Sequence, residues 1–533
     1  MKKICSMNIL LFLILFFGFI GLTNAQRIVK IAPTEFGIIN STIMGDTLAN
    51  GDRVDPNTIY ELERGVLAYY VFNGSIMHTG YNLHIRAEAG DGERPKLVPG
   101  VLEGGISNAL FRPSGDLTLE GLYMTGQDNS NVMFSGQIIR LGAEGLRITI
   151  DDCHFHGERS AFLHLDAAMS RVFITNSLLG FSILNGRGVD RRGNIMDSLL
   201  IQNSTIYNMV SRPVRDGGSG HSNYLKIDHV TYYNLGEEVS QLGETVDVTF
   251  TNNLIINPGF LGVIDDGDVD AYFNQLQPLT ADTLAGVTQK INIGHNNLWL
   301  DPQIANVFAT LSLNPAVYGD TTVVVERIFA DEDAAPLIPE GAFINEAIEF
   351  PSGPDPQVLI DLVRDVWEVH DGDEEFASFF DNGPEGVDIF GDPLYGIYPF
   401  DLAYSSSTQS YTAGENGLPL GDLNWFPDKK ADWLTSVDEI SGLGLPSEFN
   451  LSQNYPNPFN PSTVINFTLP KSGNVNLAIY DVLGREVEIL VDQEMKVGSY
   501  KVDFDASKLT SGIYFYTIQS GNFVQTKKMI LLK

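Results

Sequence analysis

The sequence is poor in cysteine, in basic residues and in long apolar runs, and each shortage excludes a class of protein. Its two cysteines are Cys5 and Cys153. Cys5 lies in an apparent leader, so a single thiol would remain after processing and no intramolecular disulfide could form. At 533 residues the chain is long enough to be stabilised by a large hydrophobic core instead.

Basic residues are outnumbered two to one by acids. The chain has 33 Lys and Arg against 67 Asp and Glu, a formal net charge of -34. The electrostatic field of this negative charge repels nucleic acid and anionic lipid, so we expect no nucleic-acid partner. The excess charge otherwise favours solubility, and some of the acids are candidates for binding calcium.

One apolar run stands out, from Ile9 to Ile20. It follows Lys2 and Lys3 and is succeeded by small or polar residues up to Ala25. This order is typical of a secretory signal peptide and is too short for a retained membrane span. We predict a signal peptide over residues 1–25 and no transmembrane anchor after its cleavage.

The middle of the chain contains a repeated pattern of alternating apolar residues that is broken each time by one pivot residue. The pivots are Gly121, Asp152, Asn176, Asn203, His229, Asn252 and His295. Gly, Asn, Asp and His enter the left-handed backbone region most readily, which suits a sharp corner between two strands. From Asp152 to Asn252 the pivots recur every 23–27 residues, the length of one solenoid turn.

An evenly spaced β-sandwich is the alternative, but it gives no reason for a pivot at the same phase in each copy. The pattern therefore favours an all-β fold built on a right-handed parallel β-helix. Residues from about 58 to 300 resemble pectate-lyase-like β-helix proteins, and Leu83–Gly90 with Arg94–Leu97 is similar to the first coils of chondroitinase-B-like members. The segment Gly417–Phe426 resembles a closing motif of secreted β-helix proteins.

The last 85 or so residues form a separate pattern. The motifs are NYPNPFNPST from Asn454, YDVLGREV from Tyr480, LTSGIYFY from Leu509 and a final KKMILLK. Between them, alternating apolar runs broken by glycine predict a small immunoglobulin-like β-sandwich. The segment resembles the type A C-terminal sorting domain of the type IX secretion system. This resemblance implies recognition by that machinery and export to the surface or medium of a Gram-negative bacterium.

These patterns divide the chain into four parts. They are a signal peptide (1–25), a parallel β-helix domain (26–434), a linker (435–446) and a sorting domain (447–533). Within the second part, residues from about 301 are expected to form a capping or inserted region, in which Gln357–Trp367 has the spacing of an amphipathic helix.

Two glycine-rich loops concentrate the basic residues. We predict that they stack on successive coils, about 5 Å apart, and form a basic cleft for an anionic polysaccharide. The predicted ligand-binding residues are Arg187, Arg191, Arg192, Arg212 and Arg215. The alternative is that these arginines pair with the chain's own acids and hold the loops together.

A polysaccharide lyase or glycoside hydrolase is the alternative function. Lyase chemistry needs a charge neutraliser at the carboxylate, for which Arg191, Arg212 and Arg215 are candidates. It also needs a base at C5, for which Lys226, His221 and Tyr224 are candidates. No motif fixes a triad, so catalytic residues stay undetermined, and a structural or adhesive surface protein is a further alternative.

No cofactor is required by any motif. Calcium is considered for an acidic loop whose candidate ligands are Asp265, Asp266, Asp268 and Asp270, although the full EF-hand pattern is absent. His154 and His156 lie two apart on one strand and share its outer face, with His164 nearby. A zinc pair is conceivable there, but without a third ligand we expect solvated surface histidines.

Overall fold

The computed structural model describes residues 27–437 and 449–532, with internal gaps. The gaps are residues 51–52, 66, 72–75, 79–80, 101–108, 127–135, 159, 183–185, 216–219, 238, 266–275, 278, 280–286, 319–321, 325–337, 352–355, 371–400, 452–453, 455–456, 470–472, 483, 496–497 and 522. The predicted signal peptide lies outside the described residues. The chain divides into two compact units, Met1–Lys429 and Lys430–Lys533. Among the described residues, none of the helices combines the length and apolar character needed to cross a membrane.

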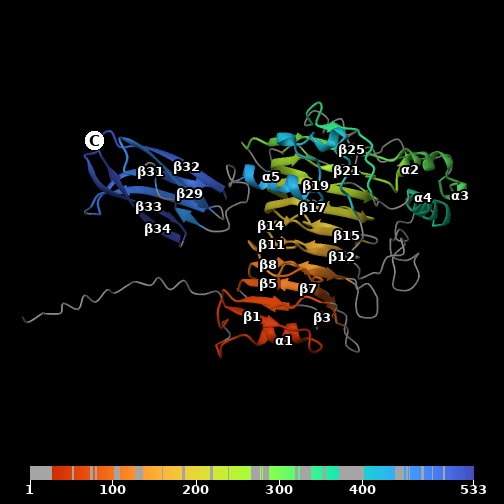
Figure 1. Cartoon of the computed structure of the whole chain (residues 1–533), viewed down its shortest axis with the longest axis horizontal. Coiled ribbons are helices and arrows are strands. Elements are labelled where there is room, and N and C mark those ends of the chain that lie inside the picture. The colour runs from red at the N-terminus through yellow and green to blue at the C-terminus, as the bar shows by residue number, and fades with distance from the viewer. Residues whose placement is uncertain are drawn as a thin grey trace, which may run out of the picture. The chain divides into compact units, whose positions relative to one another are not determined.

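The first unit is a right-handed parallel β-solenoid of about six turns, as predicted (Figure 1). Its coils follow one another along the stack in chain order, from red to green in Figure 1. Three ladders of parallel strands run along it. The first ladder comprises β1 (Ile28–Ile31), β2 (Ile59–Leu62), β5 (Leu83–Ala87), β8 (Leu117–Glu120), β11 (Arg147–Asp151), β14 (Ser170–Thr175), the first parts of β17 (Met196–Met209) and β19 (His221–Leu235), β20 (Gly243–Thr251) and β24 (Lys290–Gly294).

The other two ladders complete each coil. The second comprises β3 (Ala68–Val71), β6 (Lys96–Pro99), β9 (Tyr123–Thr125), β12 (His154–Glu158), β15 (Leu178–Ser182), the later parts of β17 and β19, β21 (Leu254–Ile256), β25 (Asn296–Trp299) and β27 (Phe343–Ile344). The third comprises β4 (Ile76–His78), β7 (Ala109–Pro113), β10 (Gln137–Arg140), β13 (Ala161–His164), β16 (Arg187–Asp190) and β18 (Val214–Arg215). The short strand β23 (Leu276–Gln277) pairs with β20, and β22 (Val263–Asp265) pairs with β26 (Thr322–Val324).

The predicted pivots form the corner between the first and second ladders. Every non-glycine pivot has a φ between 45° and 60°, and Gly121 has 70°. A second left-handed corner, which the repeat analysis missed, follows five residues later in the coils. It consists of Gly157, Phe181, Asn208, Asn234 and Asn257, with φ between 48° and 71°. The separation between the two corners is five residues in each of these coils.

Amide side chains join this second corner from coil to coil. Asn234 donates from Nδ2 to Asn208 Oδ1 at 3.0 Å, and Asn257 donates in the same way to Asn234 at 2.9 Å. All three side chains are buried. We call this chain of contacts the asparagine ladder. It supplies hydrogen bonds for amides that would otherwise be costly to bury.

Apolar side chains fill the interior of the solenoid. One row along the first ladder has no solvent exposure and is aligned strand by strand. It consists of Ile85, Leu119, Ile150, Ile174, Ile201, Ile227 and Phe250. Each such side chain contributes roughly 1.5–3 kcal/mol of transfer free energy on burial, so the stack is stabilised without a disulfide. Helix α1 (Ile38–Gly45) packs Ile39 and Ile43 over the first coil, and Ala342 joins the core at the other end.

The described residues between 301 and 426 cover a side of the solenoid as well as its end. The region contains α2 (Pro302–Val307), η1 (Phe308–Thr310), α3 (Pro315–Tyr318), α4 (Pro356–Arg364) and the π-helix η3 (Asp365–Val369). The helix expected at 357–367 is thus present, and Leu359, Leu362 and Val363 are buried against the outer face of the second ladder. This second apolar cluster explains why outward residues such as Tyr207 are not exposed.

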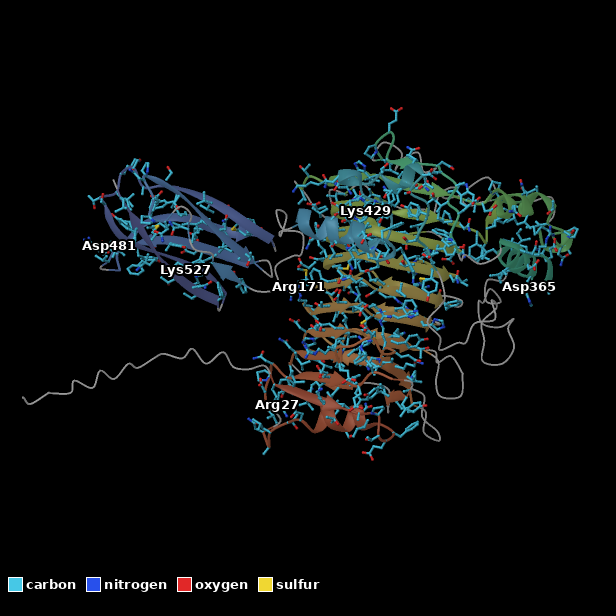
Figure 2. All side chains as sticks on the ribbon, viewed as in Figure 1. Arg27, Arg171, Asp365, Lys429, Asp481 and Lys527 are labelled. Atoms are coloured by element: carbon cyan, nitrogen blue, oxygen red, sulfur yellow. The ribbon has the colours of Figure 1, made fainter. Side chains whose placement is uncertain are left out.

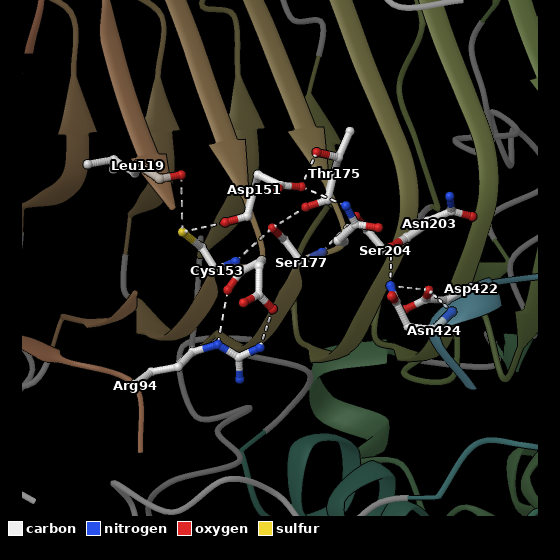
Figure 3. Close-up of polar contacts among 12 residues, drawn as sticks. Arg94, Leu119, Asp151, Cys153, Thr175, Ser177, Asn203, Ser204, Asp422 and Asn424 are labelled. Carbon is white, nitrogen blue, oxygen red and sulfur yellow. Dashed lines mark hydrogen bonds and ion pairs between the residues drawn. The ribbon is translucent and has the colours of Figure 1, made fainter. Parts of the chain in front are cut away.

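Residues 409–426, which we call the strap, cross several coils at the pivot corner. The strap contains the short helices η5 (Gln409–Tyr411), η6 (Glu415–Gly417) and η7 (Leu423–Trp425). Asn424 Nδ2 donates to the carbonyl of Asn203 at 2.7 Å (Figure 3). Gly421 N donates to the carbonyl of Asn252 at 2.7 Å. A Cβ on Gly421 would lie 2.4 Å from Thr231 Oγ1, and its φ is 82°, so only glycine fits this crossing.

The second unit begins within α5 (Pro427–Val437) and contains an antiparallel β-sandwich. One sheet has the order β28 (Asn450–Leu451), β29 (Ser462–Leu469), β32 (Gly498–Asp505). The other has the order β31 (Glu486–Met495), β30 (Gly473–Tyr480), β33 (Gly512–Ser520), β34 (Phe523–Leu531). The fold fits an immunoglobulin-like domain, as predicted. Asn454 N donates to the Tyr516 hydroxyl at 2.8 Å, which fixes the lead-in motif to the sandwich.

Candidate functional site

Three of the predicted arginines surround one buried carboxylate at the end of β16. Asp190 has no solvent exposure, and its Oδ2 lies 3.1 Å from Arg192 Nε, 3.5 Å from Arg187 Nη1 and 3.8 Å from Arg215 Nη1. The parallel pairing of β16 with β18 aligns Asp190 with Arg215. Arg192 turns back toward Asp190 because its backbone is left-handed, with φ 54°. We call Arg187, Arg192 and Arg215 the arginine cluster.

The arginine cluster has more positive charge than Asp190 neutralises. Three guanidinium groups lie within 4 Å of this one carboxylate, in a strongly acidic chain. The pKa of Arg187 is lowered by burial and then by the charge of Arg215, while Asp190 opposes the shift. The Arg192 side chain is 48% exposed, so solvent reaches the cluster. An additional anion would relieve the repulsion among these arginines.

The other two predicted arginines have different contacts. Arg212 Nε lies 3.2 Å from Glu237 Oε2, and that oxygen also accepts a hydrogen bond from the Ser211 hydroxyl. Arg191 is only 2% exposed, and it donates to the carbonyls of Asn194 at 2.6 Å and Gly220 at 2.9 Å. Burial lowers its pKa to about 10. Arg212 therefore pairs with an acid, as in the alternative considered for these residues, whereas Arg191 joins two loops from beneath the surface through backbone carbonyls.

The candidate bases lie on a different ladder from the arginine cluster. Lys226, Tyr224 and His221 belong to the first-ladder part of β19, whereas the cluster lies on the third ladder. Lys226 is buried, with Nζ 3.2 Å from Asp228 Oδ2. Burial raises the pKa of Tyr224 to about 12. His221 is half-buried and follows Gly220, whose carbonyl binds Arg191.

Asp228 is the centre of the polar network around Lys226. Its carboxylate accepts from Gln202 Nε2 at 2.7 Å, Asn252 Nδ2 at 2.8 Å and Thr251 Oγ1 at 3.0 Å. Hydrogen bonds and neighbouring positive charge hold its pKa below the ordinary range despite the opposing effect of burial. With Lys226, these contacts satisfy a buried charge and hold adjacent coils together.

The two histidines expected on the surface are in fact buried. His154 is 0% and His156 is 2% exposed, although both lie on the outer face of β12 as predicted. The expectation of solvated rings was wrong because other aromatic side chains cover that face. His154 Nε2 lies 2.8 Å from the Tyr207 hydroxyl, and the His156 ring is 4.6 Å from that of Phe181. Burial lowers the pKa of His156 to about 3.

The proposed calcium loop lies mostly outside the described residues. Only the backbone of Asp265, at the end of β22, is described, whereas Asp266, Asp268 and Asp270 are not. Within the part of the chain that the structure describes, no three His, Cys, Asp or Glu side chains gather as metal ligands would. The calcium hypothesis therefore stays a prediction.

Sequence reasoning found the arginines but not what organises them. The role of Asp190 and the second corner were missed, and Gly417–Phe426 was noted as a closing motif without its contacts across the coils. The signal for the second corner was present, because Asn208, Asn234 and Asn257 each stand five residues after a pivot. No pattern in the sequence indicated the role of Asp190, because that role depends on how strands of adjacent coils pair.

Comparison with known proteins identifies the C-terminal unit. Residues 453–532 match the family model of the secretion system C-terminal sorting domain. No curated protein and no solved structure matches the chain significantly. The match confirms the resemblance of the C-terminal residues to this sorting domain, which was noted in the sequence. The chain is a β-solenoid protein that carries a type IX secretion sorting domain, which implies interaction with that machinery and export from the cell.

Proposed function

We propose that this protein is an exported β-solenoid that binds an anionic polysaccharide at the arginine cluster, with Arg212 at its margin. The observation that carries the proposal is the contact of three arginines with the single carboxylate of Asp190. Guanidinium groups bind carboxylates and sulfates through charge-assisted, often bidentate hydrogen bonds. In a chain with net charge -34, a local positive surface selects for an anionic ligand.

A polymer suits the arrangement better than a small anion. The arginines come from two adjacent coils, and the spacing of paired strands, about 4.8 Å, is close to the length of one sugar unit. Arg187 and Arg192 on one coil and Arg215 on the next could therefore contact successive acidic groups along a chain. We further propose that the protein enters the export pathway through the signal peptide at residues 1–25 and acts outside a Gram-negative cell.

Binding is tested by titrating the purified protein with polygalacturonate, alginate, hyaluronan and heparin. The variant Arg192→Ala/Arg215→Ala should lose binding, because it removes two charges from the cluster and leaves Asp190 buried beneath it. The control Arg171→Ala/Arg485→Ala removes the same charge elsewhere, from β14 and from an ion pair with Asp481 (Figure 2). Absence of binding to every polymer, or equal loss in both variants, contradicts the proposal.

The lyase alternative is checked on the same samples. Elimination on a uronate polymer would create an unsaturated product that absorbs in the ultraviolet, whereas hydrolysis would create new reducing ends. The structure supplies no specific support for either reaction, because Lys226 is bound to Asp228 on another ladder.

A further inference from the structure

A cavity of about 360 Å³ opens where three distant segments meet at the last coil of the solenoid. The first segment is Ile293–Asn296 of β24 and β25, and the second is the turn Pro339–Ala342, together with Ile344. The strap supplies Gln409 and Ala413. The volume falls in the range of small-molecule sites, about 300–1,000 Å³. The cavity lies apart from the arginine cluster, on different strands.

The cavity depends on a missing side chain in β24. Gly294 pairs with Thr251 of β20, whose side chain donates to Asp228. At the same position on β24, glycine has no side chain. A Cβ on Gly294 would meet no atom within 4 Å, and its φ is not left-handed. The space beside it is therefore open, and a larger residue could enter it without strain.

His295 lines this cavity and carries a hydrogen-bond acceptor. Its Nδ1 lies 2.9 Å from the carbonyl oxygen of Ala413. Because a carbonyl can only accept, Nδ1 carries the hydrogen, and in the neutral ring Nε2 keeps its lone pair. His295 is exposed, and Nε2 has no hydrogen-bond partner among the described residues. The pivot conformation of His295, with φ 55°, fixes the start of the side chain.

Two further polar side chains of the lining are exposed, whereas that of Asn296 is buried. Glu340 lies at the apex of a turn closed by a 3.2 Å hydrogen bond from Ala342 N to the carbonyl of Pro339, in which Gly341 has φ 78°. Gln409 is held through its backbone N–H, which donates to Glu346 Oε1 at 2.7 Å. Both side chains are exposed, and neither contacts another described polar group. Their free carboxylate and amide add mainly acceptors to that of His295.

The lining indicates the class of ligand. Acceptors at the rim suit hydroxyl donors, while the half-buried side chain of Ile344 offers an apolar surface to C–H groups. A metal ion is disfavoured because an apolar surface does not replace its hydration, and an acidic sugar is disfavoured by the charge of Glu340. We propose that this cavity binds a neutral monosaccharide unit.

Saturation-transfer NMR on the full chain tests this proposal with glucose, galactose, mannose and N-acetylglucosamine as probes. At least one neutral sugar should bind, and Gly294→Leu should abolish the signal by filling the cavity. The control Asn292→Leu adds the same side chain at an exposed position two residues earlier on β24. Glu340→Ala should weaken binding roughly tenfold, the equivalent of a lost hydrogen bond to a charged group.

Several results would overturn the proposal. They are the absence of binding by all four sugars, unchanged binding in Gly294→Leu, and glucuronate binding at least as tightly as glucose. Saturation of the site by Zn²⁺ or Ca²⁺ with no sugar signal would also overturn it. The Arg192→Ala/Arg215→Ala variant should bind the neutral sugar normally, so failure here is distinguishable from failure of the polysaccharide proposal.

Discussion

Thr205 Oγ1 donates a hydrogen bond of 2.8 Å to Asp422 Oδ2 and so joins two residues that are 217 positions apart in the chain. The backbone N–H of Asp422 also binds the solenoid, because it donates to Thr231 Oγ1 on the next coil at 2.9 Å. The strap therefore binds two adjacent coils whose strands lie about 200 residues earlier in the chain. We infer that the packing of these coils depends on a segment that ends only a few positions before residue 430 in the sequence, where the second unit begins.

Removing the Asp422 carboxylate should weaken this fastening. We expect Asp422→Ala to lower the free energy of unfolding by about 1.5–3 kcal/mol, the usual cost of losing a buried hydrogen bond to a charged group. Urea denaturation followed by tryptophan fluorescence measures it, because Trp425 Nε1 donates to Thr205 at 2.9 Å and reports on the strap. Glu415→Ala, at an exposed strap position, should change stability little. Equal effects of the two substitutions would contradict a specific role for Asp422.

Substitution within the asparagine ladder should cost more stability than the left-handed backbone conformation alone explains. Asn234→Ala leaves both Asn208 Oδ1 and Asn257 Nδ2 without their partner, in addition to placing alanine at φ 58°. We expect a loss of about 2–4 kcal/mol in unfolding free energy.

Asn416 provides the matched control for the ladder. It also has φ 58° but is exposed and makes no ladder contact. Asn416→Ala should therefore report the backbone cost by itself, about 1 kcal/mol. If the two variants lose the same stability in thermal and urea unfolding, the ladder hydrogen bonds add nothing.

Acid should destabilise the solenoid through His156. Its pKa is about 3 in the folded chain, whereas an unfolded histidine titrates near 6.5. Between these values the unfolded state binds a proton that the folded state does not, so stability falls as the pH falls. One such group lowers the unfolding free energy by about 1.4 kcal/mol per pH unit within that window. Stability from this source is fully present above pH 6.5.

Urea unfolding at a series of pH values between 7 and 4 measures this slope, as about one proton per titrating ring. His156→Phe should reduce it while keeping the aromatic packing against Phe181. A slope that is the same in the variant and the wild type would show that His156 is not responsible.

Binding to anionic polymers should depend on salt in a way that identifies the arginine cluster. At physiological ionic strength charges are screened over about 8 Å, so affinity should fall as salt is raised. The slope of affinity against salt should be smaller for Arg215→Ala than for wild type, because fewer charges take part. Isothermal titration at several salt concentrations provides the data. A slope unaffected by the substitution would place the binding charges elsewhere.

Export should require the second unit. Removing residues 447–533 deletes the sorting domain while leaving every described strand of the solenoid intact. We expect the truncated protein to accumulate inside the cell envelope, and immunoblotting of the medium and cell fractions shows the distribution. Replacing the sandwich with an unrelated domain of similar size controls for simple truncation. Export of the truncated chain would contradict the assignment.

Local patterns in the sequence were enough to predict the repeats. Alternation placed Ile150, Ile174 and Ile201 inward, because successive residues of a strand face opposite sides. The αL-tolerant residues at Asn176 and Asn203 predicted the corners for an equally local reason. The helix at 356–364 and the sorting domain were also predicted from local pattern and motif.

Contacts between coils could not be predicted in this way. Arg191 and Arg192 are adjacent in sequence, yet one is buried beneath a loop and the other is half exposed. Alternation placed His154 and His156 correctly on the outer face but gave no information about what covers them. The partner of each side chain depends on which coil or covering segment lies beside it.

The sequence by itself determined the solenoid, its first corner, the C-terminal sandwich and the destination of the protein, because each is written in residues close together along the chain. Only the tertiary structure decided that three arginines converge on Asp190, that the strap crosses the coils, and that Gly294, His295 and Glu340 line one cavity. These arrangements join residues far apart in sequence, and strand register and packing alone bring them together.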